Sequence, residues 1–214
     1  MTIGQCRGES GVAQPMQQDV TAFVLSGGQS TRMGRDKAML PFQGSTLLER
    51  ALGLARQVAP RVGILASRAR YAAMGAWIVE DEFPDCGPLG GIHAALGATR
   101  SDLNVILSVD VPFLPVAFLT YLLERARTCP EVAVVAARSG HVVQSTSLAC
   151  RRSFRRVCEE QLRRGRYRVE DAIKAAAPLY LEEEELRARG FGPDIFRNLN
   201  TPEDLTAAQV ETPS

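Results

Sequence analysis

A glycine-rich segment near the start of the chain combines the residue types that bind a polyphosphate. Residues 25–37 read LSGGQSTRMGRDK, and an apolar run leads into them. Such a run is typical of a buried parallel strand, and open α/β sheets bind ligands at the carboxyl ends of these strands. Gly27 and Gly28 can turn sharply and bring backbone N–H groups against phosphate oxygens. Because Arg32 and Lys37 add positive charge, the segment predicts a triphosphate-binding loop and makes both residues candidate catalytic groups.

The spacing within this loop differs from two common phosphate-binding motifs. Five residues separate Gly28 from Gly34, whereas a Walker P-loop has four, and Lys37 is not followed by Ser or Thr. The pattern is not G-x-G-x-x-G either. Alone, Lys37 would be interpreted as an ordinary surface lysine; the loop before it favours a role in phosphate binding.

A second candidate segment joins an acidic residue to a group of glycines. Asp81 follows the apolar run 77–79, and Gly87, Gly90 and Gly91 come shortly after it. Glycines beside a helix start allow a planar ligand to approach closely. Because other acidic residues surround Asp81, a solvated acidic turn is the alternative to a nucleoside contact.

A third candidate is the carboxylate that ends the most apolar run of the chain. Asp110 follows residues 103–109 and precedes Val111 and Pro112. A carboxylate at this edge of a sheet can hold Mg²⁺ against phosphate oxygens. Asp110 could instead cap the turn that follows it, but its place at the ligand-binding edge favours metal binding.

The last candidates lie toward the end of the chain. Asn198 and Asn200 alternate just before residues 201–204, TPED, which predict a helix start with an N-cap, a proline and early acidic residues. The two amides can face the same way if the backbone is extended. Earlier, the Arg-rich run 151–168 is typical of a solvated helix face, and only Arg168 is retained as a candidate for phosphate binding.

The elements that must position these residues alternate between strand-like and helix-like segments. This alternation predicts an α/β fold with a single-domain, Rossmann-like, doubly wound and mostly parallel sheet. Strands are expected at 22–25, 62–66, 77–79, 103–109, 132–137 and 142–150. Helical periodicity is expected at 47–58, 118–126 and 154–162, and Thr46 with Glu49 predicts a capping box for the first of these helices.

Composition sets the class of protein. A chain of 214 residues, with 45% hydrophobic residues, suffices for one α/β domain, expected at 19–210 after a disordered leader at 1–18. The net charge of +1 argues against broad binding of nucleic acid or of an anionic membrane. No apolar stretch approaches the roughly 20 residues of a membrane span, and the first residues lack the apolar segment of a signal peptide. Five cysteines without a C-x-x-C pair are typical of free thiols, which predicts a cytoplasmic protein.

Together, the segments resemble those of the molybdenum cofactor guanylyltransferase family. The family pattern L-A-G-G-x-S-x-R-M-G-x-D-K is matched, except that Ser26 stands at the usual Ala. Four further segments follow in the family's order: the glycine-proline-leucine segment, the acidic strand end, the Gly165 to Arg168 stretch and N-x-N-T-P-E-D. The resemblance covers residues 21–208 and implies the nucleotidyltransferase type of fold.

The resemblance implies a role for each candidate residue. GTP would be bound by Leu25, Ser26, Gly27, Gly28, Lys37, Asp81 and Asp110, with Mg²⁺ on Asp110. The pterin would lie nearer Gly87, Gly90, Gly91, Arg168, Asn198 and Asn200. Two positions depart from the family: Leu65 stands where some members carry an Asn that touches the nucleotide, and Val142 replaces a common Pro after His141.

The implied reaction moves GMP from GTP to the terminal phosphate of the molybdenum–molybdopterin cofactor and releases pyrophosphate. A phosphate monoester, with a second pKa near ~6, needs no general base at neutral pH, and neither His93 nor His141 lies in the loop. Transient contact with molybdoenzymes or their chaperones is expected of such an enzyme. Two alternatives stay open: a cytidylyltransferase or sugar-phosphate nucleotidyltransferase of the same fold, against which Gly27 counts, and a nucleotide-binding maturation partner without turnover.

Overall fold

The computed structural model of the protein describes residues 19–26, 36–71 and 76–211. The predictions for the leader at 1–18 and for Gly27, Gly28 and Arg32 therefore lie outside the described residues. The described chain forms a sheet in the order β5-β4-β1-β6-β8-β7-β9. Its strands are β1 (Val20–Leu25), β4 (Arg61–Leu65), β5 (Trp77–Val79), β6 (Leu103–Ser108), β7 (Val134–Ser139), β8 (Val142–Arg151) and β9 (Leu179–Glu182). All neighbouring pairs are parallel except those of β8, which runs antiparallel to β6 and β7.

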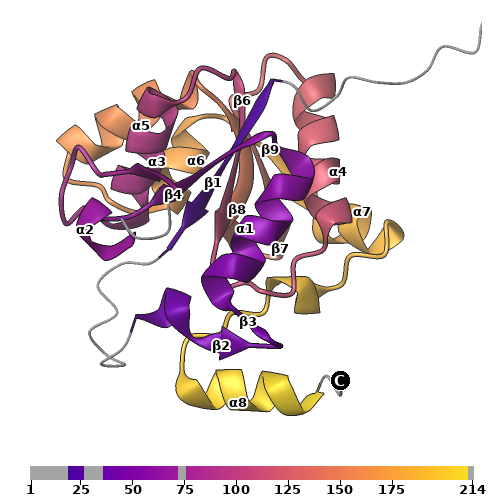
Figure 1. Ribbon diagram of the computed structural model, residues 1–214. Coiled ribbons are helices and arrows are strands. Elements are labelled where there is room, and N and C mark those ends of the chain that lie inside the picture. Colours follow the sequence, from indigo (N-terminus) through magenta and orange to yellow (C-terminus); the bar gives the residue numbers. More distant parts are fainter. Residues whose placement is uncertain (1–18, 27–35, 72–75, 212–214) are drawn as a thin grey trace, which may run out of the picture.

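Helices cover both faces of this sheet, as Figure 1 shows. One face carries α1 (Leu47–Val58), α4 (Val116–Thr128) and α7 (Glu183–Ala188), and the other carries α3 (Gly87–Ala98), α5 (Phe154–Arg163) and α6 (Val169–Ala175). Since successive side chains of a strand point to opposite faces, β1 serves both cores. Ala22 and Val24 pack into the first core, between the sheet and α1, α4 and α7. Phe23 and Leu25 pack into the second core, between the sheet and α3, α5 and α6. The predicted mostly parallel, doubly wound α/β fold is confirmed.

Capping side chains define where two of the helices begin. The Thr46 hydroxyl accepts from the Glu49 N–H at 3.1 Å, and the Glu49 carboxylate accepts from the Thr46 N–H at 2.8 Å, which confirms the predicted capping box of α1. At α8 (Pro202–Glu211), Thr201 accepts from the Asp204 N–H, and Asp204 accepts from the N–H groups of Asn200 and Thr201. These backbone donors lower the pKa of Asp204 and hold the chain around Asn200.

Short elements complete the carboxyl edge of the sheet. They are η2 (Lys37–Met39), β2 (Pro41–Phe42), β3 (Ser45–Thr46), α2 (Arg68–Tyr71) and η4 (Pro193–Phe196). In Figure 1, α8 lies at the end of the sheet toward which β1 points. The Leu199 N–H donates to the Asp110 carbonyl at 2.9 Å, which ties the segment before α8 to this edge.

Several details differ from the sequence-based expectations. Ala66 and Val109 lie beyond their strands, β7 begins at Val134 rather than at residue 132, and neither β9 nor α6 nor α7 was expected. Within the described ranges, no helix combines the length and apolar character needed to span a membrane. The four cysteines in these ranges are free, as predicted: Cys86, Cys129, Cys150 and Cys158.

Candidate active site

A cleft of about 760 Å³ opens where the parallel strands end. Strand ends and the segments after them contribute Leu25, Leu65, Ala66, Ser67, Glu80, Asp81, Ser108 and Asp110, and further lining comes from Arg70, Asp85, Gly87, Pro88, Gly91 and Thr146. The cleft thus brings together residues from three of the four segments that the sequence placed at this edge. Arg168, Asn198 and Asn200 are exposed and do not line it. The other described candidates that do not line it are Ser26, Lys37 and Gly90.

Lys37 joins three distant segments of the chain at this edge. Its Nζ donates to Asn200 Oδ1 at 2.9 Å and lies 3.6 Å from Asp110 Oδ2. The Lys37 side chain is 13% exposed and that of Asp110 is 27% exposed, so solvent screens this pair only in part. The Lys37 ammonium is therefore held in one place rather than ranging over the surface.

Asp110 is anchored through its backbone and has one carboxylate oxygen unused. The Val109 N–H donates to the Leu25 carbonyl at 3.1 Å, and Arg50 Nε donates to the Pro112 carbonyl at 2.7 Å, so the chain is held on both sides of Asp110. Among the described residues, Asp110 Oδ1 is buried and has no hydrogen-bond partner. Leaving a buried carboxylate oxygen unpaired is costly, and a bound cation would remove that cost.

The donor set at this position suits Mg²⁺ better than a transition metal. The described part of the chain holds no group of three or more His, Cys, Asp or Glu side chains that could enclose a metal. Mg²⁺ keeps several waters and commonly takes one or two carboxylates together with substrate phosphates. One unpartnered carboxylate oxygen beside a cleft large enough for a nucleotide fits that pattern.

Asp81 packs against the first turn of α3, and two glycines make room for it. A Cβ on Gly90 would lie 2.9 Å from the Phe83 carbonyl oxygen and 3.3 Å from Asp81 Oδ2. A Cβ on Gly91 would lie 3.3 Å from Asp81 Oδ1 and 3.4 Å from Leu25 Cδ2. Although Asp81 is exposed as a residue, partial desolvation of its carboxyl raises its pKa. In the structure, Gly90 and Gly91 thus allow the close fit of the Asp81 side chain beside the cleft.

Ser26 and Leu65 are linked at the ends of neighbouring strands. Ser26 is buried, and its hydroxyl donates to the Leu65 carbonyl at 3.0 Å. The Ser26 side chain therefore holds the start of the glycine-rich segment to β4. The Leu65 side chain is apolar and cannot hydrogen-bond a nucleobase, so only its backbone is available for polar contact.

Two residues of α2 contribute to this region and carry no signal in the sequence. Arg70 lines the cleft, and its Nε lies 3.9 Å from Asp36 Oδ2. The Tyr71 hydroxyl donates to the same carboxylate oxygen at 2.7 Å. Because α2 belongs to no recognisable motif and lies far along the chain from Asp36, only the fold reveals this contact.

Comparison with known proteins assigns the chain to a family. The model of the MobA-like NTP transferase domain matches residues 22–178. The chain belongs to this family. It is 31% identical over 188 residues to a molybdenum cofactor guanylyltransferase of Syntrophotalea carbinolica, covering 86% of this chain and 88% of that protein. It is 30% identical over 207 residues to one of Mesorhizobium japonicum, covering 90% and 96%.

A solved structure supports the fold of this MobA-like chain. The molybdopterin-guanine dinucleotide biosynthesis protein A of Archaeoglobus fulgidus superposes with a TM-score of 0.75, covering 89% of this chain and 97% of that protein. At 21% identity this similarity is evidence for the fold alone. The family resemblance inferred from the loop and from the N-x-N-T-P-E-D segment is confirmed.

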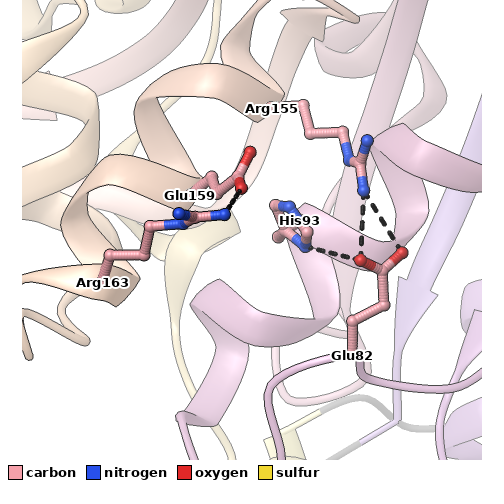
Figure 2. Close-up of polar contacts among 5 residues, drawn as sticks. All are labelled: Glu82, His93, Arg155, Glu159 and Arg163. Carbon is pink, nitrogen blue, oxygen red and sulfur yellow. Dashed lines mark hydrogen bonds and ion pairs between the residues drawn. The ribbon is translucent and has the colours of Figure 1, made fainter.

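Behind the Asp81 loop, the MobA-like domain contains a buried histidine in a charged cluster (Figure 2). His93 lies on α3, and its Nδ1 is 3.7 Å from Glu82 Oε2. Arg155 of α5 donates to both oxygens of Glu82, at 3.1 and 3.3 Å. Neither nitrogen of His93 has a hydrogen-bond partner among the described residues, and the Phe83 ring packs edge-on against the imidazole. His93 therefore supports the loop and does not face the cleft.

We expect His93 to make the stability of the protein depend on pH. Burial lowers the pKa of His93 from 6.5, and the positive charge of Arg155 lowers it further. The Glu82 and Glu159 carboxylates raise this pKa, and the positive charge of Arg163 lowers it. In the unfolded chain His93 titrates near 6.5 and binds a proton more readily than in the folded protein. The contribution of His93 to the free energy of unfolding is therefore complete above pH 6.5. It is lost as the pH falls from 6.5 toward the pKa of His93 in the folded protein.

The measurement is the free energy of unfolding by urea at about pH 7.5 and about pH 5.5. His93→Gln should show a smaller loss of stability between the two pH values than the wild type. The exposed His141 gives a matched control, since His141→Gln should lose as much stability as the wild type. Identical losses in the wild type and His93→Gln would contradict this role.

Proposed function

We propose that the protein transfers GMP from GTP to the terminal phosphate of the molybdenum–molybdopterin cofactor, which yields the guanine dinucleotide form and pyrophosphate. The observation that carries the proposal is the convergence of Lys37 and Asn200 beside Asp110, which lines the strand-edge cleft. Relatives that share about 30% of their residues with nearly the whole chain are named as guanylyltransferases of this cofactor.

The chemistry requires charge neutralisation and alignment rather than a base. The attacking group is a phosphate monoester whose second pKa lies near ~6, so it is mostly dianionic at neutral pH. Among the described residues that line the cleft, none is a histidine. Catalysis then depends on holding two highly charged substrates in line and on stabilising the charge that moves to pyrophosphate.

Basic residues at the cleft can meet this requirement. Lys37 would contact the phosphate chain from its fixed position beside Asn200 and Asp110, and Arg70 presents a positive charge from the lining of the cleft. Arg32, from the glycine-rich segment, is proposed to act with them. Asp110 would hold Mg²⁺ through its unpartnered oxygen, and the bound ion would supply further neutralisation of phosphate oxygens.

The remaining assignments divide the site between its two substrates. Backbone groups of the segment that starts at Leu25, with Ser26, Gly27 and Gly28, are proposed to hold GTP, with Asp81 on the nucleoside. The pterin is proposed to lie nearer Gly87, Gly90, Gly91, Arg168, Asn198 and Asn200. Since Asn200 Oδ1 already accepts from Lys37, its amide N–H group is the part that a pterin would use. We further propose that the protein acts in the cytoplasm and contacts molybdoenzymes or their chaperones transiently.

Replacing Asp81 should weaken the use of GTP more than the binding of the pterin. Guanine presents N–H donors on its Watson–Crick edge, and the Asp81 carboxylate is an acceptor at the cleft wall. We expect Asp81→Ala to raise the KM for GTP by about tenfold, the size expected for a hydrogen bond to a charged group. The affinity for the pterin should change by less than about twofold. An equal loss for both substrates would contradict the assignment.

The direct test of transfer is the release of pyrophosphate. With GTP and the molybdenum-loaded pterin both present, the wild type should release pyrophosphate, and removal of Mg²⁺ by a chelator should stop it. Omission of the pterin should also stop it, which separates transfer from hydrolysis. Binding of GTP without any release of pyrophosphate would instead identify a nucleotide-binding maturation partner.

A further inference from the structure

Asp36, the residue before Lys37, uses both of its carboxylate oxygens to hold local structure. Oδ1 accepts from the Ala38 N–H at 3.1 Å and so caps η2, the short turn that carries Lys37. Oδ2 accepts from the Tyr71 hydroxyl at 2.7 Å. A single carboxylate therefore connects the backbone around Lys37 to a helix that follows the neighbouring strand.

The environment of Tyr71 keeps its hydroxyl protonated, so that it can donate this hydrogen bond. Tyr71 is 2% exposed and lies among the largest fully buried side chains of the first core. Burial, and then the hydrogen bond to Asp36, raise its pKa to about 12, while the nearby Ser26 side chain acts in the opposite direction. The hydroxyl thus keeps its proton at any physiological pH. Its hydrogen bond to Asp36 joins α2 to the residue that directly precedes the Lys37 turn.

The turn that carries Lys37 is held differently on its two sides. After Lys37, Ala38 is fully buried in the core and the Leu40 carbonyl accepts from the Leu47 N–H at 3.1 Å, so hydrophobic packing and α1 hold the chain. Before Lys37, the described contacts are those of the Asp36 carboxylate with Ala38, Tyr71 and Arg70. Of the two side chains that reach Asp36, Tyr71 alone is buried, which makes it the rigid support on that side.

We propose that Tyr71 is a positioning residue for Lys37. Its hydroxyl orients Asp36, and Asp36 in turn sets the turn from which the Lys37 ammonium reaches Asn200 and Asp110. This inference rests on the proposed function, because positioning matters only if Lys37 contacts the phosphate chain. It assigns a role in the reaction to a residue that stands outside the glycine-rich segment and touches no substrate.

The test removes only the hydroxyl. Tyr71→Phe keeps the ring in the core, and we expect kcat to fall by about tenfold with the KM for GTP changed by less than about twofold, because a displaced Lys37 affects the transition state most. Tyr121→Phe is a matched control, since Tyr121 is also buried, at 4% exposure, and donates to Glu185 on the opposite part of the domain. It should leave kcat unchanged. Hydrogen exchange at the Ala38 amide should be faster in Tyr71→Phe than in Tyr121→Phe.

A double-mutant comparison shows whether Tyr71 acts through Lys37. In a Lys37→Ala background, Tyr71→Phe should cause no further loss of turnover, whereas independent effects would multiply. Multiplying losses, or an unchanged kcat in Tyr71→Phe, would overturn the proposal. A wild type that releases no pyrophosphate would remove the proposed function instead. The rate of hydrogen exchange at the Ala38 amide would then still test whether the Tyr71 hydroxyl supports the turn through Asp36. An unchanged rate in Tyr71→Phe would overturn that support.

Discussion

Lys37→Ala is expected to lower kcat by about 10²- to 10³-fold, the loss typical of removing one group that stabilises developing charge. The reason lies in the position of the ammonium, which Asn200 and Asp110 hold in place, and Asp110 lines the cleft. The melting temperature should change by no more than about 2 °C, because solvent reaches both partners of the ion pair and such pairs contribute little to stability. Steady-state kinetics and a thermal melt test both expectations.

Lys174 offers a control for the loss of a lysine as such. It pairs with Glu170 on the surface of α6, and Lys174→Ala should leave turnover unchanged. Full activity in Lys37→Ala would overturn the interpretation of the whole loop. If the activity of Lys37→Ala falls only because its melting temperature falls by a large amount, the role of Lys37 is structural.

Asp110→Asn is expected to abolish Mg²⁺-dependent turnover, with a loss of about 10²-fold or more, while the fold stays intact. The amide keeps the shape of the side chain and removes the charge that would hold the ion. Asp110 Oδ1 is buried without a partner among the described residues, which costs stability, whereas the pair of Oδ2 with Lys37 adds to it. Because these two contributions oppose each other, the melting temperature should stay near that of the wild type.

The control for Asp110 lies at the other end of the same strand. Asp102 directly precedes β6 and pairs with Arg151, away from the cleft. Asp102→Asn should leave both turnover and its dependence on Mg²⁺ unchanged. If Asp110→Asn instead keeps its activity and loses much stability, Asp110 is a cap for the turn that follows, which is the alternative left open by its sequence context.

Features that depend on short stretches of sequence were predictable. The apolar runs that became β1, β4, β5 and β6 are separated by helical periods, so the parallel half of the sheet follows from local pattern. The capping box of Thr46 and Glu49 is a four-residue signal and was equally accessible. Asp81 and Asp110 were expected at one edge because the carboxyl ends of parallel strands meet there, and both line the cleft.

Features that depend on chain reversal or on distant contacts were not predictable. The antiparallel insertion of β8 between β6 and β7 is a property of topology, which no local pattern encodes. Asn200 was assigned to the pterin from its motif alone, whereas its contact with Lys37 spans 163 positions of the sequence. Tyr71 and Arg70 stand on a single helical turn without a motif, so only the packing of α2 reveals their part in the site. The roles of Gly27, Gly28 and Arg32 stay predictions.

The mass of the product formed from competing nucleotides tests the central proposal most directly. The wild type would be incubated with Mg²⁺, the molybdenum-loaded pterin and equimolar GTP, CTP and ATP, and the products analysed by mass spectrometry. We predict that the pterin gains one GMP and that pyrophosphate accumulates in equal amount, with little CMP or AMP adduct. Equal amounts of CMP and GMP adducts would contradict guanylyl transfer as the specific activity, and the absence of any nucleotide adduct would contradict transfer to the pterin altogether.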